Sequence, residues 1–65
     1  MRGGEALNKA HNAAGAAMDI ADPVKRADAY EEVAKLYDAV GTAYGKRNAK
    51  LMRSGAAKLR AKAGK

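Results

Sequence analysis

Alanine is the sequence feature that most restricts what this chain can fold into. The 65 residues include 17 alanines and only 14 larger apolar side chains, with no Phe, no Trp and a single Ile. A helix face made of alanine lets a neighbouring helix approach closely, but it buries little apolar area per residue. A chain this short also hides a smaller share of its surface on folding than a larger domain does. We therefore expect a single domain, residues 1–65, whose thin core needs an oligomer or a partner to complete it.

Apolar residues recur at the helical period of 3.6 residues in three segments, which predicts an all-α fold. The first helix is expected over about residues 5–20. Its apolar side consists of Leu7, Ala10, Ala14, Ala17, Met18 and Ala21. Because Glu5, Lys9 and Asp19 fall on the opposite side, that side is expected to face solvent.

The start of the second helix is the clearest local feature of the sequence. Asp22 is a good N-cap and Pro23 occupies the first helical position, where proline is tolerated. The helix is expected over about residues 23–44, with Gly45 placed to end it. Its apolar stripe, a candidate core or interface, is Tyr30, Val33, Tyr37, Val40 and Tyr44. Its opposite face carries Lys25, Asp28, Glu31, Glu32, Lys35 and Asp38.

A third helix is expected over about residues 46–62, with residues 63–65 frayed. Its apolar face is Ala49, Met52, Ala56, Leu59 and Ala63. The pair Ser54–Gly55 is expected to kink this helix or to end it early. Three such helices with short connections most simply form a small three-helix bundle. The alternative is a helical hairpin, possibly oligomeric, in which the second and third segments merge into one long helix.

Charge is distributed very unevenly along the chain. Residues 1–44 hold five Lys and Arg and all seven acids, whereas residues 45–65 hold eight Lys and Arg and no acid. Like charges four residues apart, such as Lys46 with Lys50, repel one another on a helix, and an anionic surface would relieve that repulsion. Nucleic acid is the most common such surface. The predicted nucleic-acid contacts are Lys46, Arg47, Lys50, Arg53, Lys58, Arg60 and Lys62.

Two other interpretations of the basic segment stay open. Basic residues near a helix C-terminus complement the helix dipole, and Glu31, Glu32 and Asp38 are available to pair with them inside a bundle. The spacing of Gly41, Gly45 and Leu51 also partly fits a helix-turn-helix motif. Lys46 and Ser54 occupy positions that are usually apolar in that motif, so the match is too weak to indicate a family.

The three tyrosines suggest a second functional class. Tyr30, Tyr37 and Tyr44 lie within about 40° of one another around a helix. Aromatic rings on a basic protein can stack on nucleobases, but tyrosine is also suited to a core or an interface. The alternative function is therefore a structural or assembly subunit, in a virion-like or ribonucleoprotein particle, that completes its core by packing on copies of itself or on partners.

The predicted helices bring together no group of side chains that catalysis would need. The acids fall on a face expected to be solvated, where nothing would raise a pKa for acid-base work, and His11 lies at the edge of an apolar face as a boundary residue. We expect no enzyme activity, no metal and no cofactor.

A membrane partner is disfavoured, because the third segment has few large apolar anchors. With neither a signal peptide nor cysteine, the chain is expected in the cytoplasm or within an intracellular or virion assembly.

Overall fold

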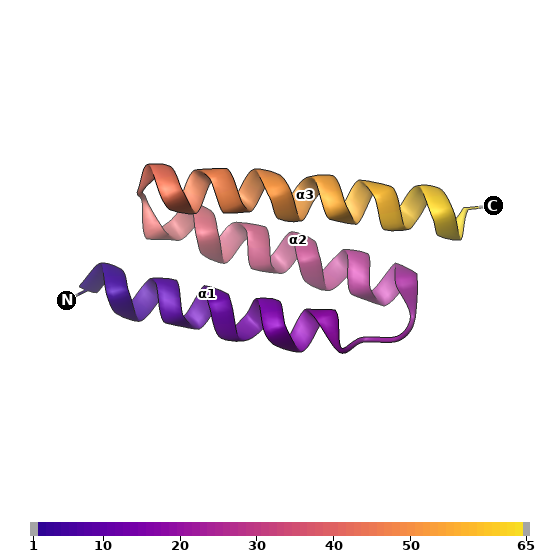
Figure 1. Cartoon of the computed structure of the whole chain (residues 1–65), viewed down its shortest axis with the longest axis horizontal. Coiled ribbons are helices and arrows are strands. Elements are labelled where there is room, and N and C mark those ends of the chain that lie inside the picture. The colour runs from indigo at the N-terminus through magenta and orange to yellow at the C-terminus, as the bar shows by residue number, and fades with distance from the viewer. Residues whose placement is uncertain (1, 65) are drawn as a thin grey trace.

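The protein is an all-α three-helix bundle, as predicted. The computed structural model describes residues 2–64, with side chains from Gly4 to Gly64. Helix α1 spans Arg2–Met18, α2 spans Pro23–Val40 and α3 spans Ala43–Ala63. Each helix runs antiparallel to the one before it, and two short connections join them (Figure 1). Helix α1 therefore ends two residues before the predicted boundary at residue 20, and α3 begins three residues before the predicted boundary at residue 46.

Helix α2 begins where Asp22 and Pro23 indicated. The Asp22 carboxylate accepts a hydrogen bond from the Lys25 backbone N–H at 3.3 Å, as an N-cap does. The Arg26 side chain also donates to the Ile20 carbonyl at 2.8 Å, across the connection from α1. The first turn of α2 is thus tied to the chain leaving α1.

The predicted end of α2 was wrong. The helix stops at Val40, and Gly41 rather than Gly45 forms its C-cap, with a left-handed φ of 77° that glycine adopts without strain. Thr42 then caps α3, because its hydroxyl accepts the Gly45 backbone N–H at 3.1 Å. Gly45 lies inside the first turn of α3 and is buried there. This turn also excludes the long merged helix of the alternative fold.

Helix α3 is continuous through Ser54–Gly55, so the predicted kink was also wrong. Gly55 has a packing role instead, because a Cβ at this position would lie 3.2 Å from two carbons of the Tyr30 ring. Helices α2 and α3 lie side by side along their lengths (Figure 1). They do not make the steep crossing of a helix-turn-helix motif, which removes that interpretation.

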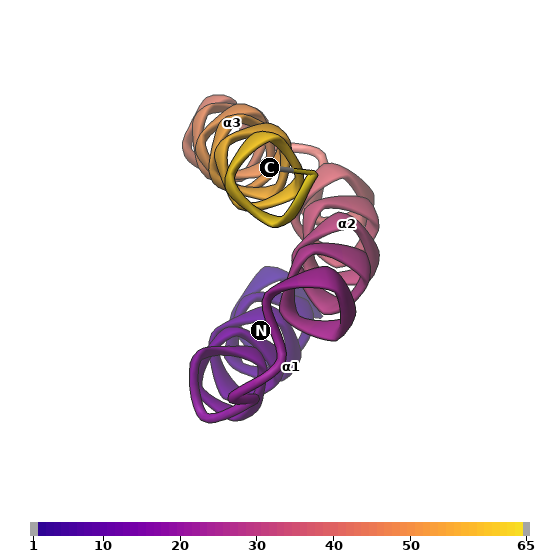
Figure 2. The ribbon, with the colours of Figure 1, turned by 90° about the vertical axis from the view of Figure 1, so that its right-hand side faces the viewer.

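The core lies on both flanks of α2, which is the central helix. Helices α1 and α3 each pack on α2 but contact each other only slightly, so the end-on view shows a bent layer rather than a closed triangle (Figure 2). The molecule measures 43 × 19 × 11 Å. Val33 and Tyr37 are the only buried core residues larger than alanine among the described side chains. The remaining buried core residues are the alanines Ala10, Ala17, Ala27, Ala34, Ala49 and Ala56.

Candidate nucleic-acid interface

Two of the seven predicted contact residues point toward α2 and form ion pairs there. Arg53 donates to the Asp38 carboxylate at 2.5 Å. Arg60 donates to Asp28 at 2.7 Å and also to Glu31. The hydrogen bonds to Glu31 and Asp28 raise the pKa of Arg60 above its already high value. These two arginines therefore join α3 to α2, and each already has a carboxylate partner there.

The other five predicted contacts share the solvent side of α3. All five are exposed, and none of them forms an ion pair with any side chain from Gly4 to Gly64. We call this group the outer basic face: Lys46, Arg47, Lys50, Lys58 and Lys62. It extends about 24 Å along the helix axis, at 1.5 Å per residue.

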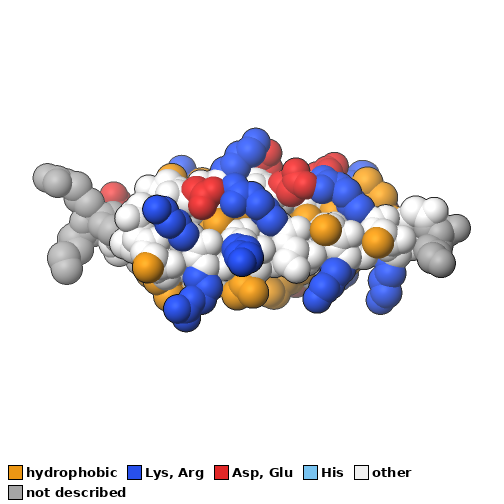
Figure 3. Space-filling model, turned by 90° about the horizontal axis from the view of Figure 1, so that it is seen from above, with side chains coloured by type: hydrophobic (Ala, Val, Ile, Leu, Met, Phe, Trp, Pro, Cys, Tyr) orange, Lys and Arg blue, Asp and Glu red, His pale blue; other side chains and the backbone are white. Residues whose placement is uncertain are grey.

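The charges are separated across the molecule. Viewed from the α3 side, Lys and Arg side chains spread over the surface, whereas most visible Asp and Glu side chains lie in one half of the view, next to some of the cations (Figure 3). The carboxylates that pair with α3 come from α2, because α3 itself contains no acid. Leu51 lies among the basic residues with 61% of its surface exposed. The outer basic face is therefore free of acidic residues along the length of α3.

The tyrosine stripe is divided by the turn between α2 and α3. Tyr37 is buried, and its hydroxyl forms a hydrogen bond with His11 Nδ1 at 2.7 Å. Burial, followed by a smaller effect of Tyr44, raises the pKa of Tyr37. Tyr44 belongs to α3, is half exposed and meets the His11 ring edge-on at 6.1 Å between centroids. His11 was predicted at the edge of the apolar face of the first helix, but nothing in the sequence indicated its tyrosine partners.

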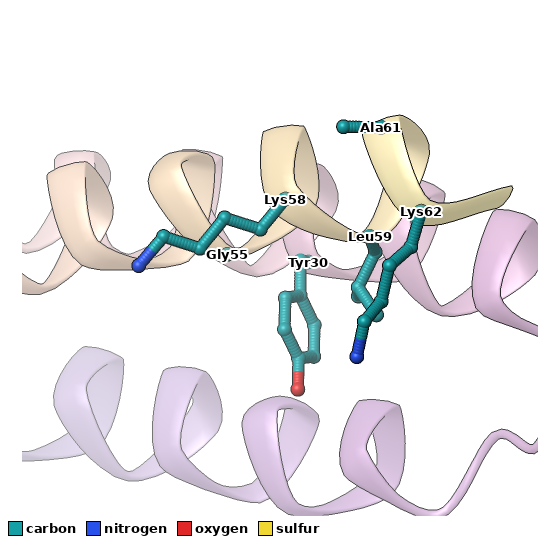
Figure 4. A pocket seen from close by; sticks show the side chains of 6 residues that line it. All are labelled: Tyr30, Gly55, Lys58, Leu59, Ala61 and Lys62. Atoms are coloured by element: carbon teal, nitrogen blue, oxygen red, sulfur yellow. The ribbon is translucent and has the colours of Figure 1, made fainter. Parts of the chain in front are cut away.

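A pocket of about 650 Å³ opens between α2 and α3. The Tyr30 ring stands in it, beside Leu59 and two lysine chains of the outer basic face (Figure 4). The lining consists of Tyr30, Gly55, Lys58, Leu59, Ala61 and Lys62. Nothing in the sequence pattern indicates this pocket, because the pocket depends on which residues of α2 and α3 lie opposite one another.

Other kinds of site find little support in the described part of the chain. No three His, Asp or Glu side chains among the described residues are grouped as metal ligands would be. No described helix combines the length and the apolar character needed to cross a membrane. Comparison with protein-family models, with curated proteins and with solved structures finds no match.

Proposed function

We propose that the protein binds nucleic acid through the outer basic face of α3. The observation that supports this proposal is the division of the cations on α3. Two arginines are neutralised by carboxylates of α2, while five other cations face solvent with no acid among them. Such a surface attracts the phosphate backbone, and phosphate contacts require no particular base sequence.

The strength of binding should depend steeply on salt. Each phosphate contact with a duplex releases condensed counterions and contributes about −0.9 to the slope of log K against log salt concentration. Five contacts therefore predict a slope of about −4.5. A surface that binds through apolar contacts would show almost no such slope.

The test is a titration of fluorescently labelled random-sequence DNA and RNA at several salt concentrations. The test variant is Lys46→Gln, Arg47→Gln, Lys50→Gln, and its matched control is Lys9→Gln, Lys25→Gln, Lys35→Gln, which removes the same charge from α1 and α2. We expect the slope of log K against log salt concentration to become shallower by about 3 in the test variant, because three phosphate contacts are lost. In the control it should change little. Circular dichroism checks that both variants keep their helix content. Absence of salt-dependent binding, or equal losses in both variants, would overturn the proposal.

A structural or assembly role is the second candidate. Large apolar side chains remain exposed on the single chain, with Met18 at 60% and Leu51 at 61% exposure, and the core consists mostly of alanine. A core this thin is typical of small chains that complete their burial on copies or partners. Measurement of the molar mass in solution separates the candidates, because a multimer that fails to bind nucleic acid at low salt would favour assembly.

A further inference from the structure

The Tyr30 pocket combines an aromatic ring with open space beside it. Tyr30 is half buried and extends from α2 into the space between the helices (Figure 4). A Cβ at position 55 would stand 3.2 Å from two carbons of the ring, so the missing side chain lets one edge of the ring lie against α3. The pocket has a volume of about 650 Å³ and is largely open to solvent, unlike the enclosed clefts that bury most of a small organic molecule.

Positive charge is restricted to the rim of this pocket. Lys58 and Lys62 leave α3 to either side of the Tyr30 ring (Figure 4), and no carboxylate belongs to the lining. Leu59 and Ala61 supply the apolar remainder. A ligand that matches this arrangement has a flat, weakly polar ring to place against Tyr30 and anionic groups next to it for the lysines.

We infer that the pocket holds one unpaired nucleobase, stacked on Tyr30, with its neighbouring phosphates on Lys58 and Lys62. The inference rests on the proposed function, because these two lysines also belong to the outer basic face. A base in a duplex is stacked on both sides and cannot enter the pocket, whereas a base in a single strand can stack on an aromatic side chain. The protein therefore binds single strands more tightly than duplexes of the same length.

The other two tyrosines do not fit this role. The hydroxyl of Tyr37 is bonded to His11 and its ring is buried. Tyr44 is exposed but packs edge-on against His11, and it is not among the residues lining the pocket. Tyr44 is therefore the matched control for Tyr30.

The experiment compares Tyr30→Leu with Tyr44→Leu on three probes of equal length: a thymine single strand, an abasic single strand and a duplex. We expect Tyr30→Leu to weaken binding of the thymine strand about tenfold and to leave binding of the abasic strand and the duplex unchanged. Tyr44→Leu should bind all three as the parent protein does. If the parent protein binds all three probes equally, the stacking inference is overturned while the proposed function stands. If none of the probes binds, the proposed function fails as well.

A second measurement does not depend on whether Tyr30→Leu folds. In the variant Tyr37→Phe, Tyr44→Phe, Tyr30 is the only tyrosine left in the chain. Its fluorescence should be quenched when the thymine strand binds and should stay constant when the abasic strand binds. Equal fluorescence with both strands would overturn the inference.

Discussion

At the scale of single residues, Gly45 sets how closely α3 begins beside the end of α2. A Cβ at this position would overlap the Tyr37 carbonyl oxygen and lie 3.1 Å from Val40 Cβ. Both neighbours belong to the last turns of α2, where a shift would disturb the buried Tyr37. By contrast, a Cβ on Gly15 of α1 would meet nothing within 4 Å. A side chain would therefore clash at Gly45 but not at Gly15, although both glycines lie in helices.

Substitution of these glycines should change stability in opposite directions. We expect Gly45→Ala to lower the free energy of unfolding by about 1–3 kcal/mol, because the added methyl overpacks the turn. Gly15→Ala should raise it by about 0.5–1 kcal/mol, because alanine favours an exposed helix interior. Urea denaturation followed by circular dichroism measures both. A neutral effect of Gly45→Ala would mean that the turn relaxes to accept the methyl group.

The buried Tyr37 hydroxyl should make stability fall at high pH. Because burial raises its pKa, the folded protein keeps the proton at a pH, above about 10, where the unfolded chain has lost it. The unfolded state then binds fewer protons, so the free energy of unfolding decreases as the pH rises. We expect Tyr37→Phe to be less stable at neutral pH by about 1 kcal/mol, through loss of the His11 hydrogen bond, and to lose less stability on further alkaline titration. Parallel alkaline decreases in the two proteins would contradict the assignment to Tyr37.

At the scale of helices, α2 and α3 are joined by charges in matching register. Glu31 and Asp38 are seven residues apart on α2, and Arg53 and Arg60 are seven apart on α3. In an antiparallel pair, the earlier acid meets the later arginine, as the structure has it. Pairing of the third helix with the acids of the second was one interpretation of the sequence, and this spacing would have identified the arginines concerned.

Release of Arg60 from its acids should strengthen nucleic-acid binding. In the variant Asp28→Asn, Glu31→Gln, we expect tighter binding and a salt slope steeper by about 1, because one more cation becomes available to phosphate. The control Glu5→Gln, Asp19→Asn removes the same charge from exposed positions outside α2 and α3. Titration of the labelled strands at several salt concentrations compares the two. An equal gain in both variants would show that net charge, rather than Arg60, is responsible.

The helices themselves could be predicted from the sequence because apolar periodicity and the Asp22–Pro23 start are local features. The two predictions that were wrong, the end of α2 and the kink in α3, concern features that depend on tertiary contacts. Two glycines were available to end α2, and the choice of Gly41 depends on Thr42 capping the next helix. Gly55 resembled a helix breaker in isolation, but it packs beside Tyr30. Of the candidate site, five of seven predicted residues lie on the outer basic face, and the pocket required the relative position of two helices.

At the scale of the whole molecule, stability should be unevenly distributed. Helix α1 packs on α2 and only slightly on α3, whereas α2 and α3 share the most extensive helix contact. We expect backbone amides of α1 to exchange with solvent faster than those of α2 and α3, because regions with fewer contacts open at lower free energy. Hydrogen exchange followed by NMR or mass spectrometry measures this. Equal protection in all three helices would indicate a single cooperative unit.

The position of α1 on one flank of α2 has a consequence for how the molecule tolerates change. The outer basic face lies on α3 and the pocket is lined by α2 and α3, so the proposed ligand contacts come from helices other than α1. A substitution that loosens α1 would expose α2 to proteases and shorten the lifetime of the molecule in a cell. A substitution on the outer side of α3 would leave that lifetime unchanged and alter only the proposed nucleic-acid binding. The lifetime of the molecule and its proposed binding can therefore change separately in a chain of 65 residues.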